Sequence, residues 1–382
     1  MDVVWFSEIK WDYLKTRKQQ LIRRKPDDVR LLYLEPYVRG RANRFDLRRE
    51  DQILCATVPF VKAIPRGPLR SLLDRRWARA LVDHAARRRV AGHMRAAGLV
   101  PAETGVVVSN VYAIDLASSV PGRFLLYDCN DAHSAFPGMP AWTETYYRAA
   151  CRRADHVIAT SQALHDDVAA IRGGREGCEV IGNGVDYGRF AHAREMLGPS
   201  SPPDIPRIGY IGAIAPWLDF EVVDQLAAVH PDWEIVLVGP VMRGVERELK
   251  RLMSRPNVAV RKPVPHDDVP ALLREFTLGV IPFRYDTLTR GVNPNKMYEY
   301  LAMGLPVVTT RFSAEVQQFP EVVAAAPAAE EFVRACERYA ALVAEPAQRS
   351  ALQETAFRIA AENDWAAIAE AFWKRVKLLA AK

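Results

Sequence analysis

Short apolar runs alternate with helix-like segments twice along the chain, and this alternation limits the fold more than any other feature. In the first half, the expected strands are 3–6, 29–35, 105–110, 123–128, 156–160 and 178–181. In the second half, they are 207–213, 233–239, 257–261, 278–283 and 306–310. These runs are almost continuously apolar, which is typical of parallel strands covered by helices on both faces. The pattern predicts two doubly wound α/β domains.

The halves are separated by a stretch rich in proline and serine, residues 197–206, in which helix is excluded. We therefore predict an N-terminal Rossmann-like domain over 1–200 and a C-terminal one over 207–362. A last helix, 363–382, has apolar residues at helical spacing and is expected to pack back toward the N-terminal domain. Two such sheets facing one another predict a ligand site in the cleft between the domains.

The charge of the chain is unevenly distributed. Residues 1–100 hold 23 Lys and Arg against 11 Asp and Glu, whereas the whole chain has a net charge of only +6. This basic end could bind lipid headgroups, a phosphorylated substrate or nucleic acid, and an ordinary solvated surface rich in arginine is an equal alternative. No nucleic-acid motif accompanies the charge, so a nucleic acid is not expected.

The cysteines and the N-terminus bear on the compartment. The five cysteines form no CxxC pair, which argues for a reducing cytosol and against disulfides or structural zinc. The first residues lack the pattern of a secretory signal, and no apolar run is long enough to span a bilayer. We expect a cytoplasmic protein that meets the inner face of the plasma membrane only peripherally.

The segment 293–310 predicts a phosphate site. Asn293 is a plausible N-cap with Pro294 at the first helical position, and Lys296 follows in the first turn. The free N–H groups of a helix start and a lysine together favour an anion. Glu299 could accept hydrogen bonds from vicinal hydroxyls of a ribose. An ordinary surface Lys–Glu pair is the alternative.

The loop 127–138 predicts acid–base chemistry. Asp128, Asp131 and His133 follow an apolar strand within six positions. Asp131 is our candidate for the base of an inverting transfer, with His133 beside it. Asp128 is expected to cap its own turn.

Five segments in order resemble the GT-B glycosyltransferases of family 4-like, or group 1, type, close to bacterial enzymes of teichuronic-acid and exopolysaccharide assembly. The loop around Asp131 is also similar, more faintly, to xanthan-type glucuronosyltransferases. The likeness extends from residue 3 to about 315. Its segments are 127–138, 154–164, 180–190, 206–223 and 293–310.

The resemblance implies that the C-terminal domain binds a UDP- or GDP-linked sugar, with Glu299 on the ribose and Lys296 on the phosphates. The other donor-binding residues expected are Gly212, Ile214, Trp217, Asp219, Val264, Phe283, Asn293 and Asn295. The N-terminal domain is expected to bind the acceptor, with contacts from Trp11 and Arg17 in the loop 7–20 and from Asn183.

Two departures leave the stereochemistry open. Gly291 stands where the retaining branch of this family has the first of two glutamates, and the loop after the strand at 207–213 lacks the usual basic pair. In an inverting enzyme Asp131 would be the base. In a retaining enzyme the leaving phosphate would be the base, and Asp131 and His133 would position the acceptor. No Asp-x-Asp motif is present, so no obligatory metal or other cofactor is expected.

The expected function is transfer of a sugar, of the hexosyltransferase type, to a lipid-linked or cell-surface polysaccharide precursor. One alternative is a nucleotide-sugar epimerase or hydrolase of the same fold. The other is a non-catalytic, degenerate transferase, which Gly291 and the missing basic pair would favour.

Overall fold

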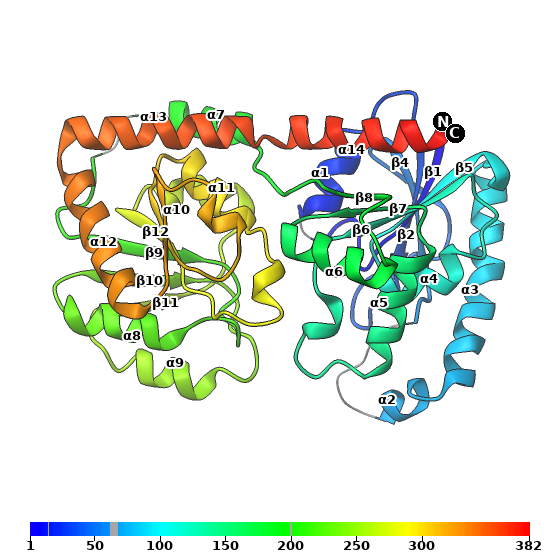
Figure 1. Cartoon of the computed structure of the whole chain (residues 1–382), viewed down its shortest axis with the longest axis horizontal. Helices are drawn as coiled ribbons and strands as arrows, with labels where there is room; N and C mark the ends of the chain where they lie inside the picture. Colours follow the sequence, from blue (N-terminus) through cyan, green and yellow to red (C-terminus); the bar gives the residue numbers. More distant parts are fainter. Residues whose placement is uncertain (14, 62–67, 199–200) are drawn as a thin grey trace. The chain divides into compact units, whose positions relative to one another are not determined.

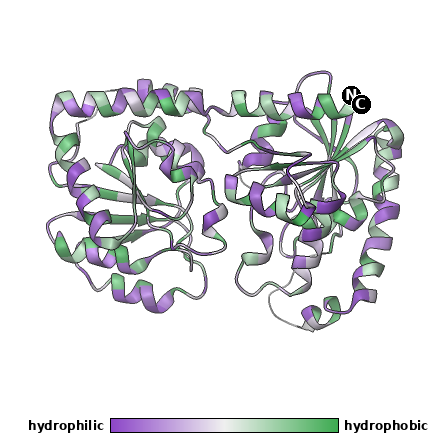
Figure 2. Ribbon diagram, viewed as in Figure 1, coloured by the Kyte–Doolittle hydropathy of each residue, from purple (hydrophilic) through white to green (hydrophobic). Residues whose placement is uncertain are grey.

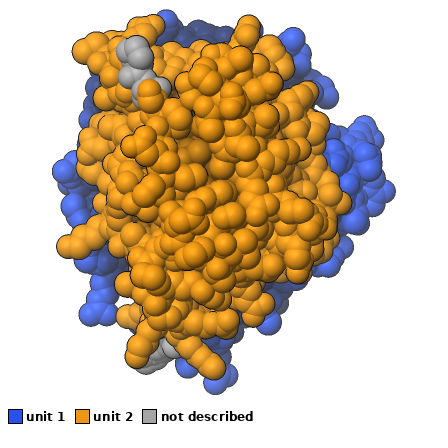
Figure 3. Space-filling model, turned by 90° about the vertical axis from the view of Figure 1, so that its left-hand side faces the viewer, with its two compact units in different colours: residues 1–182, 368–382 blue, residues 183–367 orange. Residues whose placement is uncertain are grey.

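The computed structural model describes residues 1–13, 15–61, 68–198 and 201–382. The chain forms two compact units, Met1–Gly182 with Ile368–Lys382, and Asn183–Ala367 (Figure 1; Figure 3 colours them separately). Each unit is a parallel sheet with helices on both sides, so the expected fold class is confirmed.

The first unit contains an eight-stranded sheet in the order β3-β4-β2-β1-β5-β6-β7-β8, parallel except for β3. The strands are β1 Asp2–Phe6, β2 Arg30–Pro36, β3 Arg48–Glu50, β4 Ile53–Val58, β5 Thr104–Val108, β6 Phe124–Cys129, β7 His156–Ala159 and β8 Cys178–Val180. The helices are α1 Arg17–Arg23, α2 Pro68–Leu73, α3 Arg76–Ala96, α4 Ile114–Ala117, α5 Trp142–Arg153 and α6 Gln162–Arg172.

The second unit contains a six-stranded, wholly parallel sheet in the order β11-β10-β9-β12-β13-β14. The strands are β9 Arg207–Ile211, β10 Glu234–Val238, β11 Val258–Arg261, β12 Leu278–Ile281, β13 Val307–Thr310 and β14 Val323–Ala326. The helices are α7 Tyr187–Leu197, α8 Phe220–Val229, α9 Glu246–Leu252, α10 Val269–Leu273, α11 Asn295–Ala302, α12 Ala329–Ala344 and α13 Pro346–Glu362.

The last helix, α14 Trp365–Ala380, joins the first unit from Ile368 onward. The Trp373 indole donates to the carbonyl of Leu21 at 2.8 Å, and Phe372 stacks on Trp5 with ring centroids 5.5 Å apart. The apolar spacing of this segment therefore reflects real packing against the N-terminal sheet.

The structure differs from the sequence-based expectations in three places. The units divide at Gly182, not near residue 200, because α7 places Phe190 in the core of the second unit. The expected loop 7–20 becomes helix at Arg17. The apolar strands β4 and β14 were not predicted. Residues 199 and 200 of the expected linker lie outside the described residues.

Candidate active site

The strand orders place one candidate site in each sheet. Connections leave β9 and β12 in opposite directions in the second unit, and β1 and β5 in the first. Ligands of doubly wound folds bind at the carboxyl ends of such neighbouring strands. Gly212 follows β9 and Phe283 follows β12, whereas Glu8 follows β1 and Ser109 follows β5.

Lys296 lies at this position in the second unit. Its ammonium is 4.8 Å from the ring centroid of Phe283 and 5.5 Å from that of Tyr210. Its side chain also lies so close to Gly212 that a Cβ there would be 3.0 Å from Lys296 Cε and 2.9 Å from the Tyr210 hydroxyl. The backbone of Gly212 has φ +147°, so glycine is required for both conformation and space.

The charge of Lys296 is only weakly compensated. Burial lowers the pKa of Lys296 to about 8, and the carboxylate of Glu299 partly opposes this effect. Lys296 forms no ion pair with any other residue that the structure describes. A desolvated ammonium without a carboxylate partner is strongly attracted to an anion.

Helix α11 begins beside this lysine. It starts at Asn295 with Pro294 at the N-cap, so the prediction of Asn293 as N-cap was wrong by one residue. No side chain caps the helix, which leaves its first N–H groups available to an anion. The Asn295 amide oxygen is buried and has no hydrogen-bond partner in the described part of the chain. Asn183, expected on the acceptor side, belongs to this unit and donates to the carbonyl of Asn293 at 2.9 Å.

Glu299 has a neighbour that the sequence did not indicate. His266 Nε2 lies 3.4 Å from Glu299 Oε1. The Arg189 guanidinium contacts His266 Nδ1 and also pairs with Asp267 at 3.2 Å. Because arginine can only donate, Nδ1 accepts and the proton of the neutral ring stands on Nε2, facing Glu299. His266 therefore lies beside the Glu299 carboxylate with its N–H on the side of that carboxylate.

The other expected donor-binding residues have structural roles. Asp219 caps α8 by accepting from Glu221 and Val222 N–H at 3.2 and 3.3 Å. Ile214 is fully buried, and both its backbone groups bond the segment after β10. Phe283 is buried, whereas Trp217 and Val264 are half-buried against the same core. Of these, only Phe283 contacts Lys296 directly.

Four titratable side chains gather at the corresponding edge of the first unit. Lys18 forms an ion pair with Glu8, and the Ser109 hydroxyl donates to Glu8 Oε2 at 3.0 Å. Asp131 and His133, the predicted catalytic pair, lie close enough to this ion pair to be influenced by both of its charges. The sequence pattern did not indicate Glu8, which lies two residues after the first strand.

The environment separates the pKa values of these groups. Burial raises the pKa of Asp131 to about 7; Lys18 opposes this shift and Glu8 adds to it. Burial lowers the pKa of His133 to about 4, and its Nε2 is a buried atom without a hydrogen-bond partner among the described residues. Burial would raise the pKa of Glu8, but Lys18 more than offsets this, so the pKa is lowered. Near neutral pH, Asp131 can therefore exchange a proton while His133 is neutral.

The expected acceptor contacts are already engaged within the protein. Arg17 Nε donates to Asp128 Oδ1 at 3.0 Å, so Asp128 pairs with an arginine and the prediction that it caps its own turn was wrong. The Trp11 ring packs edge-on against Tyr33, and the backbone N–H of Trp11 donates to Glu35 Oε2 at 3.1 Å. Trp11 and Arg17 therefore stabilise the elements around the site through contacts within the protein.

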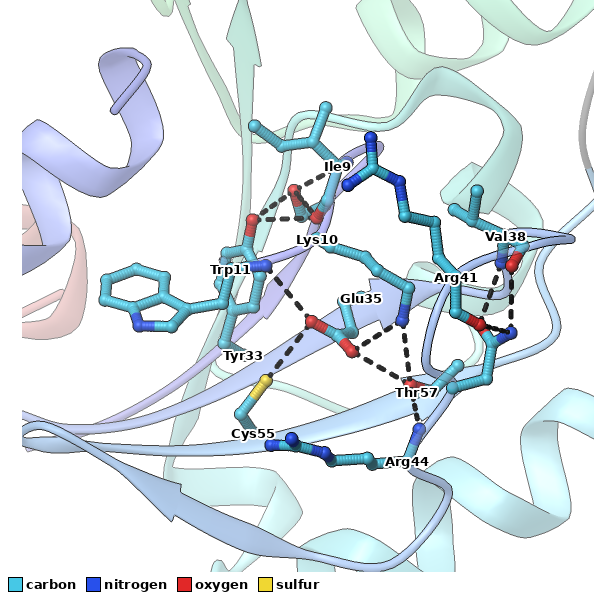
Figure 4. A network of polar contacts seen from close by, with 12 residues as sticks. Ile9, Lys10, Trp11, Tyr33, Glu35, Val38, Arg41, Arg44, Cys55 and Thr57 are labelled. Carbon is cyan, nitrogen blue, oxygen red and sulfur yellow. Dashed lines mark hydrogen bonds and ion pairs between the residues drawn. The ribbon is translucent and has the colours of Figure 1, made fainter. Parts of the chain in front are cut away.

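Glu35 is the centre of the buried network in Figure 4. Lys10 donates to Glu35 Oε1 at 3.0 Å and the Thr57 hydroxyl does so at 2.9 Å. Arg48 adds an ion pair at 3.2 Å. Because all of these charges are paired, the network stabilises the loop after β1 that carries Glu8. Across both units, no group of three or more described His, Cys, Asp or Glu residues could hold a metal ion.

Two family models match the chain. The model for glycosyl transferases of group 1 matches residues 205–341, which include Gly212, Lys296 and Glu299. The model for Glycosyltransferase Family 4 matches residues 131–189 and begins at Asp131.

A curated relative and two solved structures agree with these matches. TuaH of Bacillus subtilis, named as a teichuronic acid biosynthesis glycosyltransferase, is 29% identical over 229 residues, 56% of this chain and 58% of its own length. Sucrose-phosphate synthase from Thermosynechococcus elongatus superimposes with a TM-score of 0.74 at 16% identity, covering 100% and 99% of the two chains. Anabaena HepE, solved with UDP and glucose, gives a TM-score of 0.64 at 18% identity, covering 98% and 99%.

The two parallel sheets and these full-length superpositions show that the chain has the GT-B fold. Over the matched residues the chain is similar to the glycosyl transferases of group 1 and of Glycosyltransferase Family 4, in keeping with the resemblance of its sequence.

Proposed function

We propose that the protein transfers a sugar from a UDP-sugar to a hydroxyl of a lipid-linked or polysaccharide precursor. One observation carries the donor part: Lys296 stands beside the uncapped start of α11, between β9 and β12, with no ion-pair partner among the described residues. This arrangement provides a formal charge and several N–H groups for a diphosphate. UDP is the nucleotide proposed because HepE was solved with UDP.

In this proposal the second unit stabilises the leaving group. As the bond between the sugar and the diphosphate breaks, negative charge grows on the phosphate oxygens, and Lys296 and the N–H groups of α11 are placed to stabilise it. Glu299, which lies beside His266, would accept hydrogen bonds from the ribose hydroxyls.

The first unit would activate the acceptor. A carboxylate whose pKa is about 7, such as Asp131, is suited to take a proton from an acceptor hydroxyl near neutral pH. Neutral His133 would position that hydroxyl by accepting or donating a hydrogen bond. This assignment corresponds to an inverting transfer; in a retaining transfer, the leaving phosphate would take the proton instead.

The acceptor is proposed from the family. TuaH is named for the assembly of teichuronic acid, a cell-surface polymer. A precursor of such a polymer, carried on a lipid at the inner face of the plasma membrane, would fit the basic first hundred residues.

A thermal-shift screen against UDP, GDP, ADP, CMP and dTDP, with their common sugars, tests the donor site. A ligand that binds only the native state raises the melting temperature. We expect UDP and UDP-sugars to raise it and Lys296→Met to remove the shift. Lys250→Met, which changes an exposed lysine on α9, is the control and should keep the shift. A UDP shift that survives Lys296→Met would disprove the site assignment.

An assay of the sugar released from the donor, with and without acceptor, separates transfer from its alternatives. Transfer requires an acceptor, whereas a hydrolase would release free sugar at the same rate without one. No turnover of any donor that binds would favour a non-catalytic protein.

A further inference from the structure

Helices α2 and α3 of the first unit expose large apolar side chains. Leu69 is 59% exposed, Leu72 45%, Trp77 59% and Leu81 62%. These four fall within residues 69–81, the densest such group in the described chain. Monomeric proteins rarely leave clustered apolar surface uncovered without an interaction partner.

The spacing places these side chains on one face of each helix. Leu69 and Leu72 are three positions apart on α2, and Trp77 and Leu81 are four apart on α3. On α3 the buried positions are different ones, among them Ala78 and Ala86, whereas on α2 the buried Leu73 is four positions from Leu69. Trp77 and Leu81 therefore form a second apolar face of α3, and the exposed residues of α2 lie beside its core position.

The same two helices are strongly basic. Residues 68–97 contain eight arginines and two aspartates (Figure 2 shows hydrophilic and hydrophobic residues interleaved along both helices). Arg75, Arg76, Arg88 and Arg95 pair with no other residue that the structure describes. Arginines beside exposed leucine and tryptophan are the pattern of a helix that lies in the headgroup region of an anionic bilayer.

We propose that α2 and the first turns of α3 form a membrane-docking surface that inserts Leu69, Leu72, Trp77 and Leu81 among anionic lipids. A second copy of this chain is a poor partner for this face, because the two basic surfaces would repel each other. A nucleic acid would match the arginines but not the leucines. The inference rests on the proposed location at a membrane, but not on sugar transfer.

Sedimentation with vesicles tests the surface. The full chain is mixed with vesicles of phosphatidylcholine alone or with 30% phosphatidylglycerol, roughly the anionic content at which each basic residue contributes measurably. We expect binding to the anionic vesicles and at least about tenfold weaker binding to the neutral ones. Equal binding to both, or none to either, would overturn the proposal.

Two variants separate the apolar and the charged contributions. Leu69→Ser, Leu72→Ser, Trp77→Ser and Leu81→Ser combined should weaken anionic binding at least about tenfold. Arg75→Gln, Arg76→Gln and Arg88→Gln combined should weaken it by a similar factor and reduce its dependence on salt. The matched control replaces four exposed apolar residues of the second unit, Val229, Val241, Met242 and Met253, with serine and should bind as the parent does.

Three further outcomes would contradict the proposal. One is a dimer of the parent chain that the four-serine variant cannot form, because a second copy would then cover the face. The second is displacement from vesicles by millimolar phosphate, which would indicate a phosphate site. The third is tighter binding to a DNA duplex than to the vesicles. A UDP thermal shift recorded on the same samples keeps a failed docking surface distinct from a failed donor site.

Discussion

The two sheets differ at equivalent positions in whether the charged side chain is paired. Between β9 and β12, Lys296 stands over two aromatic rings without an ion-pair partner among the described residues. Between β1 and β5, the Glu8 carboxylate is matched by Lys18 and receives a hydrogen bond from Ser109. At the first of these edges the ammonium has no ion-pair partner among the described residues and is only partly compensated by Glu299, whereas at the second the Glu8 charge is paired with Lys18.

This difference suggests that one unit binds the donor and the other transfers the proton. An uncompensated cation in a desolvated place gains most from a charged ligand, as the diphosphate of a donor would be. A balanced cluster gains little from binding charge, but it fixes the pKa of a neighbour, here Asp131. A substitution at the Lys296 edge should therefore impair donor binding, and a substitution at the Asp131 edge should impair proton transfer without affecting donor binding.

Replacement of Asp131 should have the largest effect. Asp131→Asn removes the proton acceptor of an inverting transfer and should lower kcat about 10³-fold. The affinity for UDP should not change, since the second unit is intact. Steady-state transfer kinetics and calorimetric UDP titration check the two parts. Transfer at near-normal rates would instead indicate the leaving phosphate as the base.

The pH dependence of UDP binding should report Lys296. In the protein without UDP, Lys296 has a pKa of about 8, and a bound diphosphate favours the protonated form of its side chain. UDP affinity should therefore be constant between pH 6.5 and 7.5 and should fall by up to about tenfold per pH unit above 8. Calorimetry of the parent and of Lys296→Arg, which stays charged, checks this; an identical decline in both would assign the titration to another group.

His266 should influence donor binding indirectly. His266→Ala removes the imidazole that lies 3.4 Å from Glu299 and should weaken UDP binding about threefold to tenfold, the effect expected from losing one polar contact. His266→Gln can donate from a similar place and should recover part of the loss. A fall in kcat without a change in UDP affinity would contradict the positioning role.

A carboxylate outside both edges should affect stability alone. Burial raises the pKa of Asp83 to about 7, with a smaller effect from Asp115. The folded chain then holds a proton that the unfolded chain releases above pH 4, so the free energy of unfolding should fall as pH rises from about 4 to 7. Asp83→Asn removes this dependence and should be more stable at pH 8 by on the order of 2 kcal/mol. Urea unfolding at pH 4.5 and 8 measures the difference, and equal slopes with pH in both proteins would exclude Asp83 as the cause.

The sequence predicted most of the parallel strands because each of these is an almost continuous apolar run, but it missed β4 and β14. It also placed Lys296, Glu299, Asp131 and His133 at strand ends or helix starts, since those boundaries carry local signals such as proline and glycine. The strand order is not a local property, and Glu8 could not be joined to Ser109 without it. The hydrogen-bond partners of the side chains could not be predicted from the sequence for the same reason. Asp219 caps a helix, and Arg17 pairs with the buried Asp128.

The most direct test of the division of work is a parallel calorimetric titration of UDP into Lys296→Met and Asp131→Asn, beside the parent chain. Lys296→Met should weaken UDP binding by about 100-fold or more, as the loss of a desolvated charge pair requires, while Asp131→Asn should bind UDP as the parent does. Equal losses in both variants, or a normal affinity in Lys296→Met, would contradict the account.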